Sequence, residues 1–131
     1  MLKQAIDFFE ESQDIYKILS NISENSLDTT TQFKYWSFND IIRHLHVWNI
    51  AAYKSLQGDI EWESFNNNLQ NFFKEGKKLS DFEKSITKNL KGKSLLDIWQ
   101  STFKNVSEEF KKEPPKKRVK WVGPDMSVIS S

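Results

Sequence analysis

The sequence of 131 residues predicts an all-α fold, in which helices pack into a bundle within a single domain. Apolar residues recur at spacings of three, four and seven along several stretches, as they do on one face of a helix. Only four glycines and three prolines interrupt the chain, and strand-like alternation is confined to a brief segment near its end. Amphipathic helices of this length must bury their apolar faces against one another, and a helical bundle does so.

The first predicted helix covers residues 2–22. Its apolar positions share helical spacing, and polar residues separate them: Leu2, Ala5, Ile6, Phe9, Tyr16, Leu19 and Ile22. Residues 23–35 are rich in Ser, Thr, Asn and Asp, so a loop is expected there.

The second predicted helix covers residues 38–57. Ser37 followed by Asp40 resembles a helix start, because the hydroxyl accepts from free backbone amides and the helix dipole favours the carboxylate. Gly58 and Asp59 are expected to end this helix. Its predicted buried stripe is centred on Leu45 and contains five residues: Ile41, Leu45, Trp48, Ala52 and Leu56.

The remaining chain predicts shorter helices, one long helix and a tail. One or two short helices are expected within residues 61–90, where Gly76 interrupts the helical spacing. A long helix is predicted over residues 94–112, with Ser94 as its cap and two prolines after its end. The tail, residues 118–131, is expected to be extended, to turn at Gly123, and to start another helix at about Met126.

Composition excludes several classes of function. Nineteen basic and eighteen acidic residues give a net charge of +1, so no global charge attracts nucleic acid or a membrane surface. The basic run of residues 111–120 lacks interleaved aromatics and is expected to be a solvated loop. No stretch approaches the roughly 18 apolar residues of a membrane span. We expect a cytoplasmic protein without nucleic-acid or membrane partners.

Histidine is the residue type that raises the question of a metal site. The chain has no cysteine, so a metal could be held only by His, Asp or Glu. Its two histidines, His44 and His46, lie two positions apart, which places them about 200° apart around a helix, so they cannot share one ion. A histidine at the edge of an apolar stripe is more often a packing residue than a ligand. Spacing alone does not choose between the two.

Three stretches together resemble the DinB-like, mycothiol-dependent maleylpyruvate isomerase superfamily. They are WSFNDIIRHLHVWNIAAYKSL, FKEGKKLSDFE and VKWVGPDMS. The resemblance is to a branch of metal-binding proteins of unknown activity. It implies an up-and-down four-helix bundle that binds zinc or nickel through one histidine on the second helix and a Glu-x-x-x-His pair on the fourth.

The resemblance distinguishes the two histidines. The histidine that precedes leucine in the motif corresponds to His44, whereas His46 has no ligand role in the pattern. The fourth helix would begin at about Met126, so the other ligands are expected beyond Ser131. We therefore expect a chain truncated before the fourth helix and inactive alone.

The resemblance also implies cofactors and partners. A low-molecular-weight thiol, activated by the metal, would attack a small electrophilic substrate and give isomerisation or S-transfer. Trp48 and Trp121 are candidates for lining the pocket.

An alternative interpretation is a non-catalytic interaction domain. In that case the groove left open by the missing helix would accept a partner helix or form a dimer interface.

Overall fold

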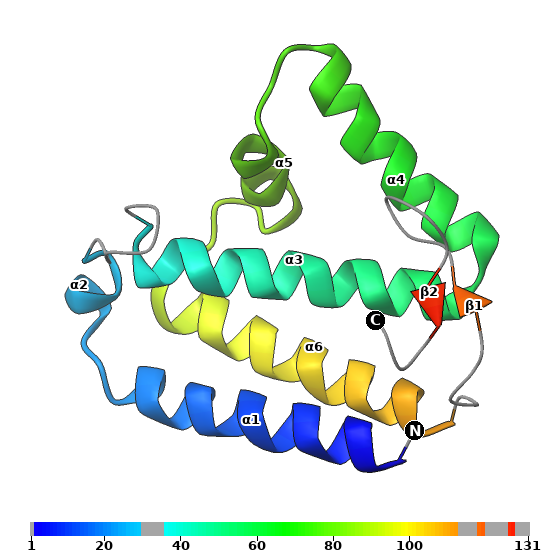
Figure 1. The fold of residues 1–131 in the computed structure, drawn as a ribbon. Helices are drawn as coiled ribbons and strands as arrows, with labels where there is room; N and C mark the ends of the chain where they lie inside the picture. The colour runs from blue at the N-terminus through cyan, green and yellow to red at the C-terminus, as the bar shows by residue number, and fades with distance from the viewer. Residues whose placement is uncertain (1, 30–35, 113–117, 120–125, 128–131) are drawn as a thin grey trace.

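Helices make up nearly all of the described chain, which confirms the predicted all-α class (Figure 1). The computed structural model describes residues 2–29, 36–112, 118–119 and 126–127. Within these residues the helices are α1 (Leu2–Ser20), α2 (Glu24–Leu27), α3 (Phe38–Gln57), α4 (Asp59–Lys74), α5 (Leu79–Ile86) and α6 (Gly92–Lys112).

A pair of two-residue strands lies after the last helix. Strands β1 (Arg118–Val119) and β2 (Met126–Ser127) are antiparallel, with Val119 opposite Met126. Met126 was expected to start a helix, but it is extended here, because pairing with β1 gives its backbone polar groups partners in the ladder.

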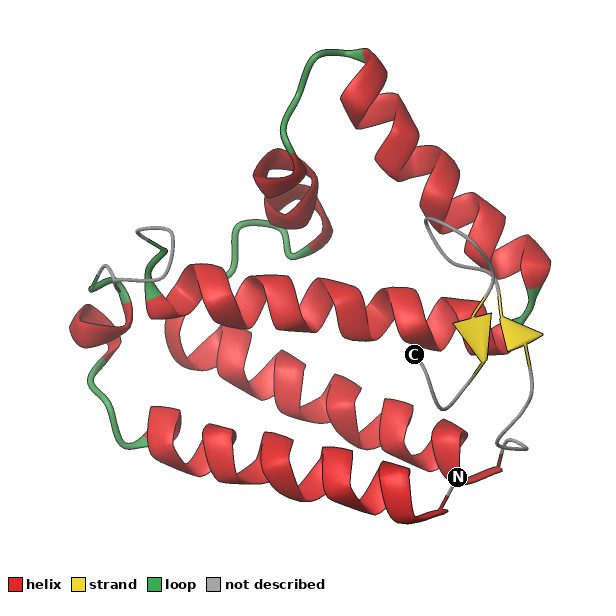
Figure 2. Ribbon diagram, viewed as in Figure 1, coloured by secondary structure: helices red, strands yellow, loops and turns green. Residues whose placement is uncertain are grey.

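The long helices α1, α3 and α6 form the bundle. Helix α6 packs against both α1 and α3, and the three run side by side in Figure 1. Helices α4 and α5 contact α3 and each other, and they lie on the opposite side of α3 from α1 (Figure 2).

Helix α3 is therefore buried on two faces. Its face toward α6 contributes to an apolar cluster of Leu19, Leu27, Ile42, Leu95, Leu96, Trp99 and Phe103. Its face toward α4 and α5 contributes to a second cluster of Val47, Ala51, Trp62, Phe65, Leu69 and Phe82. A third cluster, at the other end of α6, contains Ala5, Ala52, Leu56, Val106 and Phe110.

The predicted stripe on α3 is wrong at its centre, because Leu45 is 37% exposed. At about 100° per residue, Ile42 and Val47 point about 140° apart around the helix, toward α6 and toward α4 with α5. Leu45 points away from both of these faces, in the direction that Ala52 and Leu56 take farther along the helix, where the third cluster buries them. A single stripe could not describe a helix with neighbours on two sides.

Local signals fix the ends of several helices. Ser37 caps α3 as expected: its Oγ accepts from the backbone N–H of Asp40 at 3.1 Å, and the Asp40 carboxylate accepts from the backbone N–H of Ser37 at 3.0 Å. Helix α6 begins at Gly92, two residues before the expected cap. The one-turn helix α2 lies in the segment expected to be a loop.

In the described part of the chain, none of the helices combines the length and the apolar character needed to cross a membrane.

Candidate metal site

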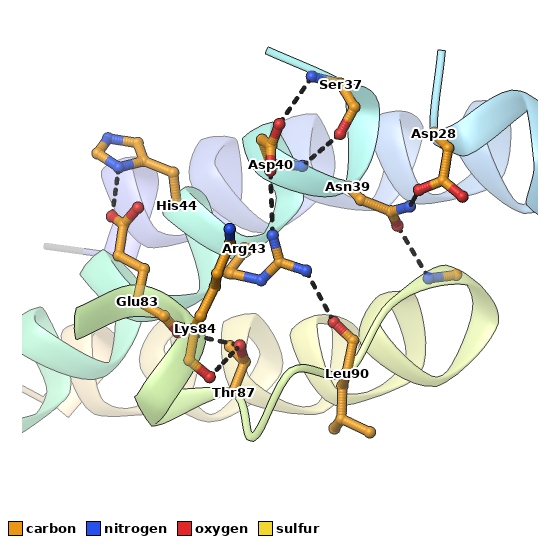
Figure 3. Close-up of polar contacts among 11 residues, drawn as sticks. Asp28, Ser37, Asn39, Asp40, Arg43, His44, Glu83, Lys84, Thr87 and Leu90 are labelled. Atoms are coloured by element: carbon orange, nitrogen blue, oxygen red, sulfur yellow. Dashed lines mark hydrogen bonds and ion pairs between the residues drawn. The ribbon is translucent and has the colours of Figure 1, made fainter. Parts of the chain in front are cut away.

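The imidazole of His44 projects from α3 toward α5. Its Nδ1 lies 2.6 Å from Oε2 of Glu83 (Figure 3). The His44 side chain is 36% exposed, whereas that of Glu83 is only 6% exposed. A half-exposed histidine thus contacts a carboxylate that is almost wholly enclosed by protein.

Glu83 reaches this position because α5 is anchored by its apolar residues. The neighbouring Phe82 is fully buried. The centroid of its ring lies 5.4 Å from that of Phe65 and 5.5 Å from that of Phe72, both on α4. The same Glu83 oxygen also accepts a hydrogen bond from Nε1 of Trp48 at 3.1 Å. Packing of α5 onto α3 and α4 therefore brings the carboxylate between two side chains of α3.

Two indoles flank the His44 ring. The ring centroid of Trp36 lies 5.2 Å from that of His44 in an edge-to-face arrangement, and the Trp48 centroid lies 6.1 Å away in a tilted one. Aromatic pairs at such separations are stabilising. These contacts and the Glu83 bond together limit how the imidazole can rotate.

A polar pocket of about 220 Å³ lies beside this pair. It is lined by Trp36, Asp40, Arg43, Ser80, Glu83 and Lys84. The buried Arg43 donates to Asp40 at 3.1 Å and to the backbone carbonyl of Leu90 at 3.0 Å (Figure 3). Arg43 therefore connects the wall of this pocket to the turn between α5 and α6 through a hydrogen bond.

His44 itself lines a second, more apolar pocket of about 200 Å³ across α1, α3 and α6. Its lining residues are Phe8, His44, Leu45, Trp48, Asn49, Ala52, Val106 and Phe110. Trp48 is among them, and Trp121 lies outside the described residues. The two members of the pair therefore line different pockets, Glu83 the polar one and His44 the apolar one.

His46 has a different environment. It is only 2% exposed, and its Nδ1 has no hydrogen-bond partner among the described residues. Burial lowers the pKa of His46 from its usual 6.5 to about 4, because a charged imidazole loses its hydration there. His46 is a neutral core residue, and the structure does not bring it to His44.

The described residues hold no group of three or more His, Cys, Asp or Glu side chains placed to hold a metal ion. A site with an open position needs about three protein ligands. His44 has the donor chemistry for one of them.

Sequence reasoning missed Glu83, although a signal for it was present. Glu83 follows Leu79 by four residues and precedes Ile86 by three, so it lies on the apolar face of α5. An acidic residue among apolar neighbours of one helix face indicates a buried carboxylate that has a partner.

Comparison with protein families matches residues 8–131 to the family described as mycothiol maleylpyruvate isomerase N-terminal domain. The match covers nearly the whole chain. Comparisons with curated proteins and with solved structures found no match.

Proposed function

Because this chain belongs to the mycothiol maleylpyruvate isomerase N-terminal domain family, we propose that it binds a divalent metal ion, zinc or nickel, with His44 as a ligand. The proposal places the ion at the Nε2 atom of His44. Imidazole nitrogen is a common ligand for both metals.

The contact between His44 and Glu83 carries this proposal. Nδ1 of His44 is engaged by the carboxylate at 2.6 Å, and Figure 3 shows the second ring nitrogen on the side of the ring away from Glu83. Metal-binding histidines commonly use one nitrogen for the metal and donate the other N–H to a carboxylate. The contact of His44 Nδ1 with Glu83 fits the carboxylate half of this arrangement, whereas His46 is enclosed in the core.

The remaining ligands belong to the same proposal. The resemblance implies a Glu-x-x-x-His pair for these positions, and no such pair lies beside His44 among the described residues. With His44 as the one ligand in the described part of the chain, we expect weak metal binding.

The family membership supports a thiol-using isomerisation or S-transfer as the chemistry of the completed site. A bound divalent cation lowers the pKa of a coordinated acid, and a thiol activated in this way is a stronger nucleophile at neutral pH. The pocket lined by Glu83 and the pocket lined by His44 offer space for a thiol and for a small electrophilic substrate.

Paramagnetic NMR titration tests the metal proposal and detects weak binding. Ni²⁺ added to the protein should broaden the ring resonances of His44 first, with less effect on His46, because broadening falls steeply with distance. Zn²⁺ should shift the Nε2 resonance of His44. Equal effects on both histidines, or none at millimolar metal, would contradict the proposal.

Two histidine variants provide the matched comparison. His44→Gln should remove the site-specific broadening from the neighbouring Trp36 and Trp48 resonances. His46→Leu replaces the buried ring with an apolar side chain and should retain it. Circular dichroism would confirm that both variants keep the helical content of the parent protein.

A further inference from the structure

We infer that Glu83 is a positioning residue that fixes His44 in its Nδ1–H tautomer and so makes Nε2 the nitrogen available to a metal. The inference rests on the proposed function for its metal-binding part. Its first part concerns a proton and a hydrogen bond in the protein itself, so the two parts can fail separately.

The position of the proton follows from the two contacts of the Glu83 carboxylate. An indole N–H can only donate, so Oε2 of Glu83 accepts from Trp48 Nε1 at 3.1 Å. The same oxygen lies 2.6 Å from Nδ1 of His44. An ionised carboxylate can only accept hydrogen bonds, so with Glu83 in that form the hydrogen shared at this distance belongs to Nδ1.

The state of the other ring nitrogen of His44, Nε2, then follows. A neutral imidazole carries one proton, and a proton on Nδ1 leaves the lone pair on Nε2. Nε2 lies on the side of the ring away from Glu83 (Figure 3), and the His44 side chain is 36% exposed. A ligand that approaches from outside therefore meets the lone pair rather than an N–H.

Glu83 is suited to hold this arrangement because it has little freedom. Its side chain is 6% exposed, and its backbone carbonyl accepts from Oγ1 of the buried Thr87 at 2.9 Å. Phe82, the preceding residue, is fully buried. The carboxylate thus aligns the imidazole before any ligand arrives, and carboxylate partners of metal-binding histidines also raise ligand basicity.

Nitrogen-15 NMR of the imidazoles tests the tautomer without any metal, because protonated and unprotonated ring nitrogens resonate far apart. In the parent protein, Nδ1 of His44 should be the protonated nitrogen. Glu83→Ala should shift His44 toward the Nε2–H form and move the indole N–H resonance of Trp48, which loses its acceptor. If His44 already carries its proton on Nε2, or if Glu83→Ala changes neither signal, the inference is wrong.

Zinc affinity tests the second part. Glu83→Gln preserves side-chain volume and should raise the zinc concentration needed to shift the Nε2 resonance of His44 by about 10-fold, the lower end of the loss typical for such a carboxylate partner. Trp48→Phe removes the donor but leaves the carboxylate and should weaken binding less. Glu63→Gln, an exposed change on α4, is the matched control and should leave affinity unchanged.

The outcomes separate the two claims. An Nδ1–H tautomer together with weaker zinc binding in Glu83→Gln supports the full inference. Unchanged zinc affinity in Glu83→Gln overturns the positioning role even if the parent protein binds zinc. The Nδ1–H tautomer without zinc binding by the parent protein overturns the metal proposal but not the assignment of the proton.

Discussion

The side chain of Asn39 ties the start of α3 to the start of α6: its Oδ1 accepts a hydrogen bond from the backbone N–H of Gly92 at 2.8 Å (Figure 3). The same amide donates to Asp28 at 2.6 Å. Asn39 is 3% exposed, and Gly92 is also buried. One buried side chain therefore joins three segments that are distant in the sequence.

Asn39→Ala should destabilise the protein by about 1–3 kcal/mol. The change leaves the buried N–H of Gly92 without its acceptor, and an unsatisfied buried donor costs about this much. Urea denaturation followed by circular dichroism measures the difference. Asn67→Ala, at an exposed position of α4, is the control and should change stability by no more than about 0.5 kcal/mol. Equal losses in the two variants would show that the bond to Gly92 contributes nothing.

Ser37→Ala should cost about 1 kcal/mol, because it removes the hydroxyl that accepts from the Asp40 backbone N–H at the start of α3. Ser37→Asp keeps an acceptor there and should recover most of the loss. The midpoint of urea unfolding gives both values. Ser101→Ala, an exposed change within α6, should not lower stability. A Ser37→Ala protein as stable as the parent would contradict the role of the cap.

The sequence contained enough information to predict the helical class and the start of α3. Helical spacing and the pair of Ser37 and Asp40 are local properties, and both depend on residues within a few turns of one another. The one-turn α2 was missed because four residues are too few for a periodic pattern. Leu45 was placed in the core because spacing reports an apolar face without revealing how many neighbours the helix has.

The candidate site was predictable only in part, because spacing along the sequence does not reveal which segments contact one another. His44 and His46 could not be separated by spacing, and the structure shows that burial separates them. Glu83 lies 39 residues from His44 in the sequence, so their contact depends on how α5 folds back on α3. Local patterns do not encode such a contact, although the position of Glu83 on an apolar helix face hinted that it had a partner.

Phe103→Ala should destabilise the protein by about 3–5 kcal/mol, the cost of emptying a fully packed aromatic site. Phe103 is fully buried. The centroid of its ring lies 5.0 Å from that of Trp99 and 5.8 Å from that of Phe9 on α1. Phe73→Ala is the matched control, since that ring is 43% exposed on α4 and its loss should cost far less. Both losses are measured by urea denaturation. If Phe103→Ala and Phe73→Ala lose similar stability, the packing of Phe103 between α1 and α6 does not contribute as proposed.

His46 should make the protein less stable in mild acid. Burial lowers its pKa in the folded protein to about 4, whereas an unfolded chain has the usual value of 6.5. Between these values the unfolded state binds the extra proton, so the free energy of unfolding falls as pH falls through this interval. From about pH 7 to about pH 5.5 the loss due to His46 should be about 1 kcal/mol.

Urea denaturation of the parent protein and of His46→Leu at both pH values isolates this contribution, because the carboxylates titrate in both proteins. His46→Leu should show the smaller loss, and the difference between the two losses is the part due to His46. Its leucine also removes a buried ring nitrogen that lacks a partner among the described residues, so the variant should fold at neutral pH. If His46→Leu and the parent protein lose the same stability, the imidazole of His46 is hydrated or paired in the folded state.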